Sequence, residues 1–307
     1  MKKYIYPLLV LLLGACDSLR QEVDPSYLTK EPEKLVVMSF ISPQDTMLRA
    51  VVSLSRPVLG EESNGFRFVA NATLTISDGS REATFQQNSS QNAAQLFYFV
   101  RTKDFPIQAG RTYTLTVRAP DGRQVTARTT VPAPVTPQDL LLDSTQTFRD
   151  GRRSKEYFVR LRWNDPTGSA NYYRVAGLFR YRPASPAQAA RAENLINFSR
   201  NEETRDLVDD RQNDGQLLIS SRGFFLMGTT GTSTTFRQIL DTFREASFSV
   251  DLLHTDENYY RYHEAVTRQN QTGGNPFAEP VLIPSSINGG LGCFGSYNRT
   301  NLPLRLK

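Results

Sequence analysis

The sequence predicts a mainly β protein, in which an N-terminal immunoglobulin-like or fibronectin-like antiparallel β-sandwich precedes a β-rich α+β domain with one prominent amphipathic helix. Three observations support this fold class. Short segments of alternating polar and apolar residues, separated by turn residues, follow one another over residues 34–131. More strand-like segments follow a proline-rich boundary, and one strong helical pattern begins at Asp256.

Residues 1–15 have the pattern of a lipoprotein signal peptide. Two lysines precede an apolar run at residues 8–13, and a glycine and an alanine stand directly before Cys16. The run is far shorter than the roughly 20 apolar residues that a membrane-spanning helix needs. A short buried N-terminal helix is the alternative interpretation. We expect cleavage before Cys16 and acylation of this residue with palmitate or similar fatty acids, because several acyl chains anchor a protein stably.

Residues 33–133 are predicted to form the sandwich, after a flexible tether over residues 16–32 that is polar and contains two prolines. In the clearest strand Tyr113, Leu115 and Val117 alternate with threonines, which separates a buried face from a solvated one. Such a fold is usually a spacer or a binding module, and the fold alone assigns no function. The seven expected strands cover residues 34–41, 47–54, 70–77, 81–87, 95–101, 112–119 and 123–131.

A second domain is predicted over residues 138–307. Prolines at positions 132, 134 and 137 mark its boundary, because they stiffen the chain and cannot donate to a β-ladder. Ser185 and Pro186 favour a short helix that runs to Leu195, with proline at the first helical position. The polar segment 197–215 is expected to be a mobile loop. Strands are expected at residues 157–163, 171–181, 217–227 and 247–254.

The segment 256–295 joins the amphipathic helix to a run rich in proline and glycine. Tyr259, Tyr262 and His263 share one helical face, Asp256 can cap the start, and two glycines at 273 and 274 can end the helix. Prolines then fix φ, and glycines allow positive φ and close backbone approach. We therefore expect an ordered loop over residues 275–295 that offers a partner or ligand surface. The candidate surface residues are Tyr260, Asn275, Phe277, Glu279 and Asn288.

Three runs in this part of the chain are distinctive: YYRY at residues 259–262, NPFAEP at 275–280 and GGLGCFG at 289–295. Together with KLVV at 34–37 and AGRTYTL at 109–115, they resemble the DUF4249 family of Bacteroidetes lipoproteins, a domain of unknown function. The likeness covers nearly the whole mature chain. It implies an outer-membrane lipoprotein that accompanies TonB-dependent nutrient uptake, and no activity is carried over because the family has none assigned.

The resemblance leaves the membrane face open. Some lipoproteins of this phylum carry an acidic surface-export signal after the lipidated cysteine, and residues 17–22 lack a contiguous acidic run. Both the periplasmic and the cell-surface face therefore stay open. The net charge of +5 falls to +3 when Lys2 and Lys3 leave with the signal peptide, and it is spread without a long basic block. This pattern argues against a nucleic-acid partner.

Residues with catalytic or metal-binding chemistry are few. Two histidines, His254 and His263, are too few for the usual multi-histidine zinc sites. Residues 210–215 loosely imitate a calcium loop, but the glutamate expected at its last position is Ser221, so an ordinary acidic turn is preferred. The glycine-rich run at 228–235 lacks the lysine of a phosphate loop. No cofactor or catalytic residue is assigned, although a triad assembled from distant residues stays open.

Several other residues have two interpretations. Tyrosines and phenylalanines of the second domain can form a binding surface or simply its core, and Tyr260 is the one expected to point away from the core. Cys293 has no partner once Cys16 is acylated, and we expect it to be a small buried residue rather than a nucleophile. Thr46 and Ser144 lie in short sequences that resemble an O-glycosylation site of this phylum.

Three functions fit the sequence. The first is a non-catalytic binding or assembly accessory of an outer-membrane TonB-dependent transporter, whose partner is a β-barrel. The second is an adhesin or envelope scaffold, which should associate with peptidoglycan or a surface polymer. The third is a hydrolase, which should show a pocket where Ser, Asp or Glu side chains converge. Because no catalytic motif is present, the accessory is preferred and the hydrolase is placed last.

Overall fold

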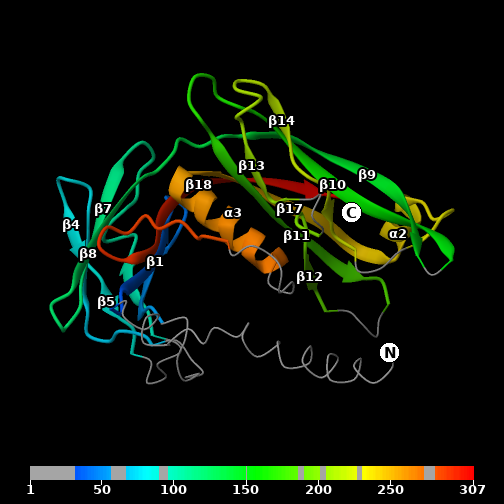
Figure 1. Ribbon diagram of the computed structural model, residues 1–307. Helices are drawn as coiled ribbons and strands as arrows, with labels where there is room; N and C mark the ends of the chain where they lie inside the picture. The colour runs from blue at the N-terminus through cyan, green and yellow to red at the C-terminus, as the bar shows by residue number, and fades with distance from the viewer. Residues whose placement is uncertain are drawn as a thin grey trace, which may run out of the picture.

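The computed structural model describes residues 32–56, 67–89, 96–149, 151–185, 190–200, 205–226, 230–272 and 281–307. This part of the chain is mainly β, with several antiparallel sheets and two helices, as the sequence predicts (Figure 1). The signal peptide, Cys16 and nearly all of the tether lie outside the described residues. No helix within the described segments is long and apolar enough to cross a membrane.

The N-terminal half is a sandwich of two sheet layers. The four-stranded sheet β4-β3-β7-β8 faces the part of a nine-stranded sheet ordered β18-β1-β2-β6-β5, and apolar side chains of both layers share one core. Tyr113, Leu115 and Val117 of β7 are buried as predicted. The strands are β1 (Leu35–Ile41), β2 (Met47–Leu54), β3 (Thr73–Ser77), β4 (Glu82–Thr84), β5 (Gln86–Gln87), β6 (Tyr98–Arg101), β7 (Thr112–Arg118) and β8 (Gln124–Thr130).

The second half packs a sheet built on β10 against the rest of the nine-stranded sheet, ordered β12-β11-β17-β18. Side chains from both sheets, among them Trp163 and Phe248, form a second core. The strands are β9 (Pro137–Arg149), β10 (Arg152–Asn164), β11 (Tyr172–Pro183), β12 (Ala192–Leu195), β13 (Leu207–Asp209), β14 (Leu217–Ile219), β15 (Gly223–Phe224), β16 (Thr230–Gly231), β17 (Phe243–Thr255) and β18 (Leu291–Arg305). The helices are α2 (Phe236–Asp241) and α3 (Glu257–Thr272).

Strand β18 joins the two halves, and here the structure corrects the sequence prediction. Residues 291–295 were expected in a loop, but they begin a 15-residue strand that pairs in parallel with β1 and antiparallel with β17. Gly292 lies opposite Val37 at φ +110°, and a Cβ at this position would stand 2.1 Å from the Val37 carbonyl oxygen. The absence of a side chain at Gly292 therefore allows β18 to lie close to β1. The segment forms an extended strand, although its glycines suggested a turn.

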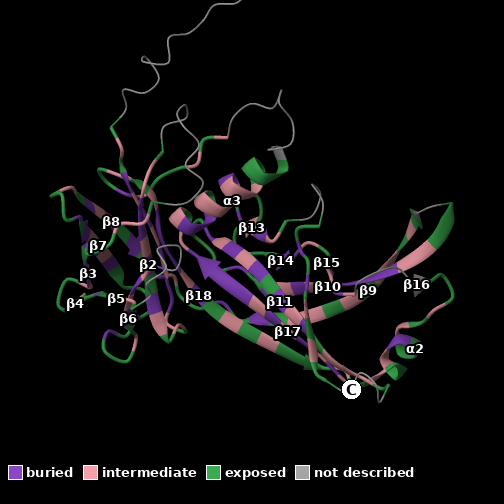
Figure 2. Ribbon diagram, turned by 90° about the horizontal axis from the view of Figure 1, so that it is seen from below, coloured by how far each residue is buried: buried purple, intermediate pink, exposed green. Residues whose placement is uncertain are grey.

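Helix α3 begins as predicted and covers β18 and β11 (Figure 2). The Asp256 carboxylate accepts the backbone N–H of Tyr259 at 2.9 Å, which satisfies a free donor of the first turn. The predicted aromatic face packs inward: the rings of Tyr259 and His263 both lie 5.1 Å from the ring of Phe40 on β1. The residues expected to end the helix, 273 and 274, lie outside the described part.

Two predictions between β11 and α2 were wrong. The helix expected from Ser185 to Leu195 is not formed over the described residues of that stretch, because Ala192–Leu195 form β12 on the edge of β11. The segment 197–215, expected as a loop, contains β13, which pairs with the same edge of β11. In both cases an available sheet edge supplies backbone hydrogen bonds that local composition does not reveal, so tertiary pairing overrides propensity.

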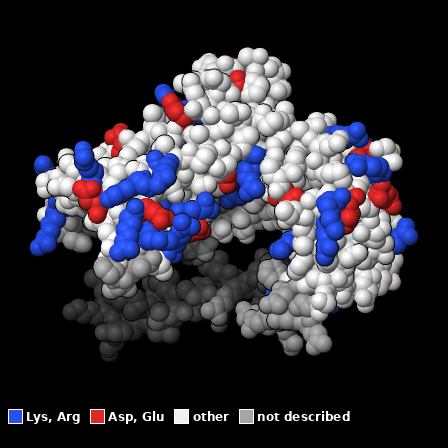
Figure 3. All heavy atoms as spheres, turned by 180° about the vertical axis from the view of Figure 1, so that it is seen from behind, with Lys and Arg blue, Asp and Glu red and all other residues white. Residues whose placement is uncertain are grey.

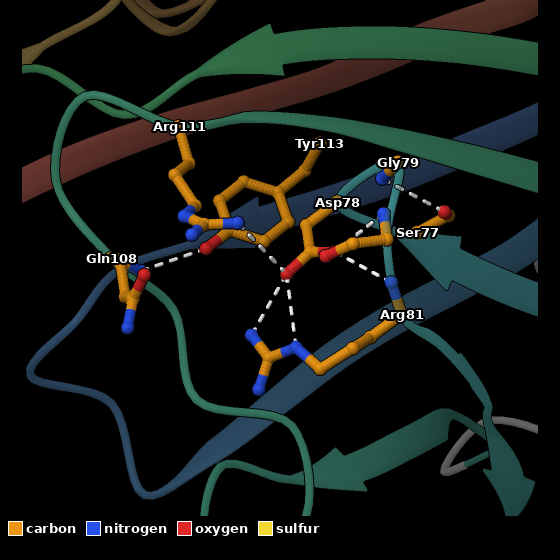
Figure 4. A network of polar contacts seen from close by, with 8 residues as sticks. Ser77, Asp78, Gly79, Arg81, Gln108, Arg111 and Tyr113 are labelled. Carbon is orange, nitrogen blue, oxygen red and sulfur yellow. Dashed lines mark hydrogen bonds and ion pairs between the residues drawn. The ribbon is translucent and has the colours of Figure 1, made fainter.

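The turn between β3 and β4 is held by a compact polar network around Asp78 (Figure 4). Its carboxylate accepts hydrogen bonds from the backbone and side chain of Ser80 and from the backbone N–H and guanidinium of Arg81. Arg111 Nη1, next to the start of the neighbouring strand β7, lies 3.6 Å from Asp78 Oδ2. The bonds from Arg81 are the main reason that the pKa of Asp78 lies well below its ordinary value. All of these partners belong to the turn or its neighbour, so the network is structural.

Candidate functional site

A groove of about 900 Å³ opens along β11, between the two short strands on its edge. β11 pairs with β13 through residues 172–174 and with β12 through residues 178–181. Between these ladders, single backbone bonds replace a strand: Val175 N–H donates to Asp206, and the Gly177 carbonyl accepts from Ile196. The interruption leaves space beside the sheet edge.

The floor of the groove is apolar. The chain after β12 crosses from one sheet to the other, where Asn197 and Phe224 exchange backbone hydrogen bonds. Gly223 is required at this crossing, because a Cβ there would lie 2.5 Å from the Phe198 ring. Leu195 stands at the rim with 80% of its surface exposed. The apolar lining consists of Val175, Ala176, Leu195, Ile196, Phe198, Phe224, Phe225, Leu226 and Leu253.

Two arginines border this floor, and both are held in place. Arg174 Nε donates to Asp206 at 2.7 Å, and its Nη1 donates to the Tyr259 hydroxyl at 3.0 Å. Arg200 binds both oxygens of Glu156 at 2.9 Å and stacks 4.7 Å from the centre of the Phe224 ring. Bidentate and stacked guanidinium groups lose little further freedom when they bind a ligand. The rim therefore combines preorganised cations with an apolar surface.

The histidines do not form a nucleophile–base pair within the described residues. His254 Nδ1 lies 2.7 Å from the Ala133 carbonyl and Nε2 lies 3.1 Å from the Asn171 side-chain oxygen, so both nitrogens face polar acceptors of the chain. His263 Nδ1 lies 3.4 Å from Arg174 Nη1. Burial, reinforced by the Arg174 charge, lowers the pKa of His263 to about 4. At neutral pH His263 is therefore an uncharged residue that packs under α3.

A carboxylate cluster lies where the sequence suggested an acidic turn. Asp165, Asp210 and Asp214 bring their side-chain oxygens within 4.8 Å of one another. Asp165 accepts hydrogen bonds from the Tyr173 hydroxyl and the Gly215 N–H, and Asp210 accepts from Asn171. The cluster thus ties the chain around β10, β11 and β14 together, and its spacing also suits a bridging cation.

The model of the family described as "Domain of unknown function (DUF4249)" matches residues 18–302. The chain belongs to this family. A search of curated proteins found no match. Among solved structures, the chain is similar to "Enterococcal surface protein, partial N-terminal region", with 9% identity, 93% of this chain and 98% of that chain covered, and a TM-score of 0.16. A TM-score of 0.16 means that the two structures do not share a fold that could be used for comparison.

One of the predicted surface residues of this DUF4249 protein, Tyr260, is buried. Tyr260 is 5% exposed, and its hydroxyl donates to Asp209 at 3.0 Å, so the expectation that it points away from the core was wrong. The physical reason is that the Asp209 carboxylate on β13 accepts the polar tip of the tyrosine inside the packed helix–sheet contact. Asn275, Phe277 and Glu279 lie outside the described residues.

Asn288 lines a second, polar groove of about 530 Å³, between β8, the start of α3 and the loop before β18. Its backbone N–H donates to the Thr126 carbonyl at 2.7 Å and its carbonyl accepts from the Thr126 N–H at 3.2 Å, so the loop is ordered here as expected. The remaining lining residues are Thr114, Thr126, Ala127, Arg128, Asn258 and Ser286. Of the glycosylation candidates, Thr46 is exposed and Ser144 is half-buried.

Most aromatic side chains of the DUF4249 chain's second half belong to its core, including Tyr173, Phe225 and Tyr259. Phe224 is different, because it lines the groove beneath Arg200. Cys293 is buried and unpaired, as predicted. No sequence pattern indicated the groove beside β11, because its lining residues come from four strands in two sheets, from helix α3 and from the segments between them. A weak signal was available in Arg200 and Asp206, charged residues of the groove in a segment that was expected to be a loop.

Proposed function

We propose that this protein is an outer-membrane lipoprotein, anchored through acylated Cys16, that acts as a non-catalytic binding or assembly accessory of a TonB-dependent nutrient uptake system. Support for the anchor comes from the signal-peptide pattern and the cysteine that follows it. The proposal applies to either the periplasmic or the cell-surface face of the membrane. Its direct partner is the β-barrel transporter.

The groove beside β11 carries the proposal. Its volume of about 900 Å³ lies within the range of natural ligand sites, roughly 300–1,000 Å³. The apolar floor supplies the affinity and the Arg174 and Arg200 guanidinium groups supply orientation, which together suit binding of a ligand or of a partner loop. Neither histidine is arranged as a general base toward a serine among the described residues, so the groove favours binding over hydrolysis.

The decisive experiment is photo-crosslinking in native membranes from a single position at the groove rim. Leu195 is suited to the crosslinking residue because it is 80% exposed. We expect one β-barrel protein to be crosslinked from position 195. A matched probe at Leu282, which is 90% exposed and outside the groove lining, should crosslink the same barrel weakly or not at all.

A groove-filling variant completes the test. Ala176→Trp places a large ring over the exposed position at the centre of the groove, and it should abolish the crosslink while the thermal melt stays within a few degrees of wild type. Recovery of peptidoglycan or surface polymer in place of a barrel would support the adhesin or scaffold function. Turnover of ester or glycoside substrates that is lost in Ala176→Trp would support a hydrolase. Either result would overturn the accessory proposal.

A further inference from the structure

Charge does not distinguish a contact surface on the face shown in Figure 3, where Lys and Arg side chains are interspersed with Asp and Glu side chains on both halves. Backbone pairing distinguishes β9. This strand, at the margin of the second half in Figure 1, pairs with β10 along one edge, and no described strand pairs with its other edge. β9 has 13 residues, whereas most strands have about 3–10. An open edge of this length can pair with a strand of another chain.

The backbone groups of alternate residues face this open edge. In an antiparallel strand one residue directs its N–H and C=O toward its neighbour, and the next directs them away. The Ser144 N–H donates to the Asp143 carboxylate at 2.7 Å, so it is not part of the ladder with β10. Ser144 therefore belongs to the outward set. The same alternation places Leu140, Leu142, Gln146 and Phe148 in that set.

Strand β18 has an open edge on the same side. It lies in the opposite layer and contacts β9, and its pairing with β1 stops at Ser296. The N–H of Arg299 donates to the Gln44 side chain at 2.9 Å, and no described strand pairs with this edge of β18 beyond Arg299. Both layers of the second half therefore end side by side in unpaired edges.

An apolar strip lies between these two edges. Leu140 and Leu142 of β9 and Leu302 of β18 pack against the second core but are only partly buried. Leu304, whose ladder partner Phe248 is buried, is 37% exposed. The second core is therefore incompletely covered on this side, and a contiguous exposed apolar surface is typical of a protein contact.

The two open edges differ in how they are protected against further pairing. Pro303 lies four residues beyond Arg299 in β18 and therefore in its outward set, where the missing N–H prevents a ladder from continuing. Between Gln138 and Phe148, β9 has neither proline nor lysine, the residues with which natural edge strands most often avoid pairing. β9 is therefore the edge suited to a partner strand.

From these observations we infer that β9 pairs antiparallel with β9 of a second copy of this chain, about a two-fold axis at Ser144. A two-fold axis sets the same surface of each copy against the other. It joins the two open β9 edges into one ladder and brings the two apolar strips together. A lone extended segment of another protein would pair with β9 but would supply no second layer over Leu304, whereas a second copy supplies both layers.

The charges of β9 select the register of this ladder. Like charges directly opposite each other destabilise a ladder, and β9 carries Asp139 and Asp143. An axis at residue 141 would set Asp139 opposite Asp143 of the partner subunit, and an axis at residue 143 would set the two copies of Asp143 opposite each other. An axis at Ser144 instead sets Leu140 opposite Phe148 of the partner subunit. This register covers the Phe148 ring, which is 74% exposed in the single chain.

Disulfide crosslinking of the full chain in isolated cell envelopes tests the contact and its register. Opposed residues of a hydrogen-bonded antiparallel pair have Cα atoms about 5.5 Å apart, which is within disulfide range. Ser144→Cys should therefore give a covalent homodimer on a non-reducing gel after mild oxidation. Gln146→Cys should crosslink about tenfold more slowly or less, because the two copies of residue 146 lie on opposite sides of the axis, about 14 Å apart. The parent chain measures any disulfide through Cys16 or Cys293.

Sedimentation of the detergent-solubilised full chain measures the dimer without a crosslink. Gln146→Lys sets a lysine against Leu142 of the partner subunit at two symmetric places, and it should raise the dimer dissociation constant about tenfold or more. The matched control is Gln86→Lys, the same change at an exposed position of the edge strand β5, and it should sediment as the parent chain does. Both glutamines are exposed, so the thermal melts of both variants should match that of the parent chain.

Four results would overturn the inference. A parent chain that sediments as a monomer, or equal weakening by the two lysine variants, would remove the β9 dimer. Crosslinking through Leu142→Cys with none through Ser144→Cys would remove the stated register. A crosslink from position 144 to a different envelope protein, with no homodimer, would identify a foreign strand on this edge.

Discussion

The Thr129 hydroxyl on β8 donates a hydrogen bond to the Asp256 carboxylate at the start of α3, with a donor–acceptor distance of 2.5 Å. The same carboxylate accepts the backbone N–H of Ser296 on β18 at 3.0 Å and caps α3 through Tyr259. One half-buried side chain therefore ties together the N-terminal sandwich, the strand that joins the two halves and the helix above them.

Asp256→Ala should lower the free energy of unfolding by about 2–4 kcal/mol, because it removes a helix cap and leaves buried donors unpaired. Burial raises the pKa of Asp256 above its ordinary value. The folded state therefore holds the proton more tightly than the unfolded chain, and this residue's contribution to stability falls as the pH rises above the ordinary carboxyl range. Denaturant titrations from pH 4 to 7 measure both effects. A variant as stable as wild type, with an unchanged pH profile, would contradict this role.

Gly292→Ala should be far more damaging than Gly289→Ala. Both positions have positive φ, but a Cβ at 292 would lie 2.1 Å from the Val37 carbonyl oxygen, whereas at 289 the nearest atom is 3.5 Å away. We expect a cost of about 1 kcal/mol at 289 and more than about 3 kcal/mol at 292. Similar melting temperatures for the two variants would show that β18 does not approach β1 as described.

Cys293 should resist thiol reagents in the native protein. Its side chain is 1% exposed, and burial raises the pKa of the thiol to about 12, so little thiolate is present at neutral pH. Labelling should become fast in denaturant. The measurement is the rate of reaction with a thiol-specific chromophore, using Cys16→Ser protein so that Cys293 is the remaining thiol. Fast labelling without denaturant, or an intermolecular disulfide, would contradict burial.

Asp78→Ala should lower the melting temperature, because Asp78 accepts hydrogen bonds from Ser80 and Arg81 across the β3–β4 turn. Its pKa is depressed in the folded state, chiefly by Arg81, so its contribution is present at neutral pH and is lost as the pH falls below the ordinary carboxyl range. Thermal melts at pH 7 and pH 3 should therefore differ less in the variant than in wild type. Asp78→Asn, which keeps an acceptor, serves as the milder control.

Cys16 should carry the lipid. Labelled palmitate should enter the wild-type protein expressed in a lipoprotein-processing host, and Cys16→Ala should take no label and leave the membrane fraction. The label is followed by gel fluorography after membrane separation. A Cys16→Ala protein that is still labelled would place the acyl group elsewhere.

Local pattern was enough to predict much of the fold. The period-two alternation of β7 and the helical periodicity of α3 each show which side chains of a segment face the core. Both elements can therefore be predicted without knowing which other segments they pack against. The burial of Cys293 also follows from local composition. The Asp256 cap was predictable, because its donor is three residues away.

Tertiary structure decided the rest. The glycine-rich sequence around Gly292 suggested a turn. Gly292 belongs to a strand because β18 pairs in parallel with β1 at this position. Tyr260 is buried because Asp209, 51 residues away, accepts its hydroxyl. The groove beside β11 exists because two short strands leave a gap on one sheet edge. A sequence encodes the preference of each segment for an apolar layer, but the identity of that layer depends on contacts between segments far apart in the chain.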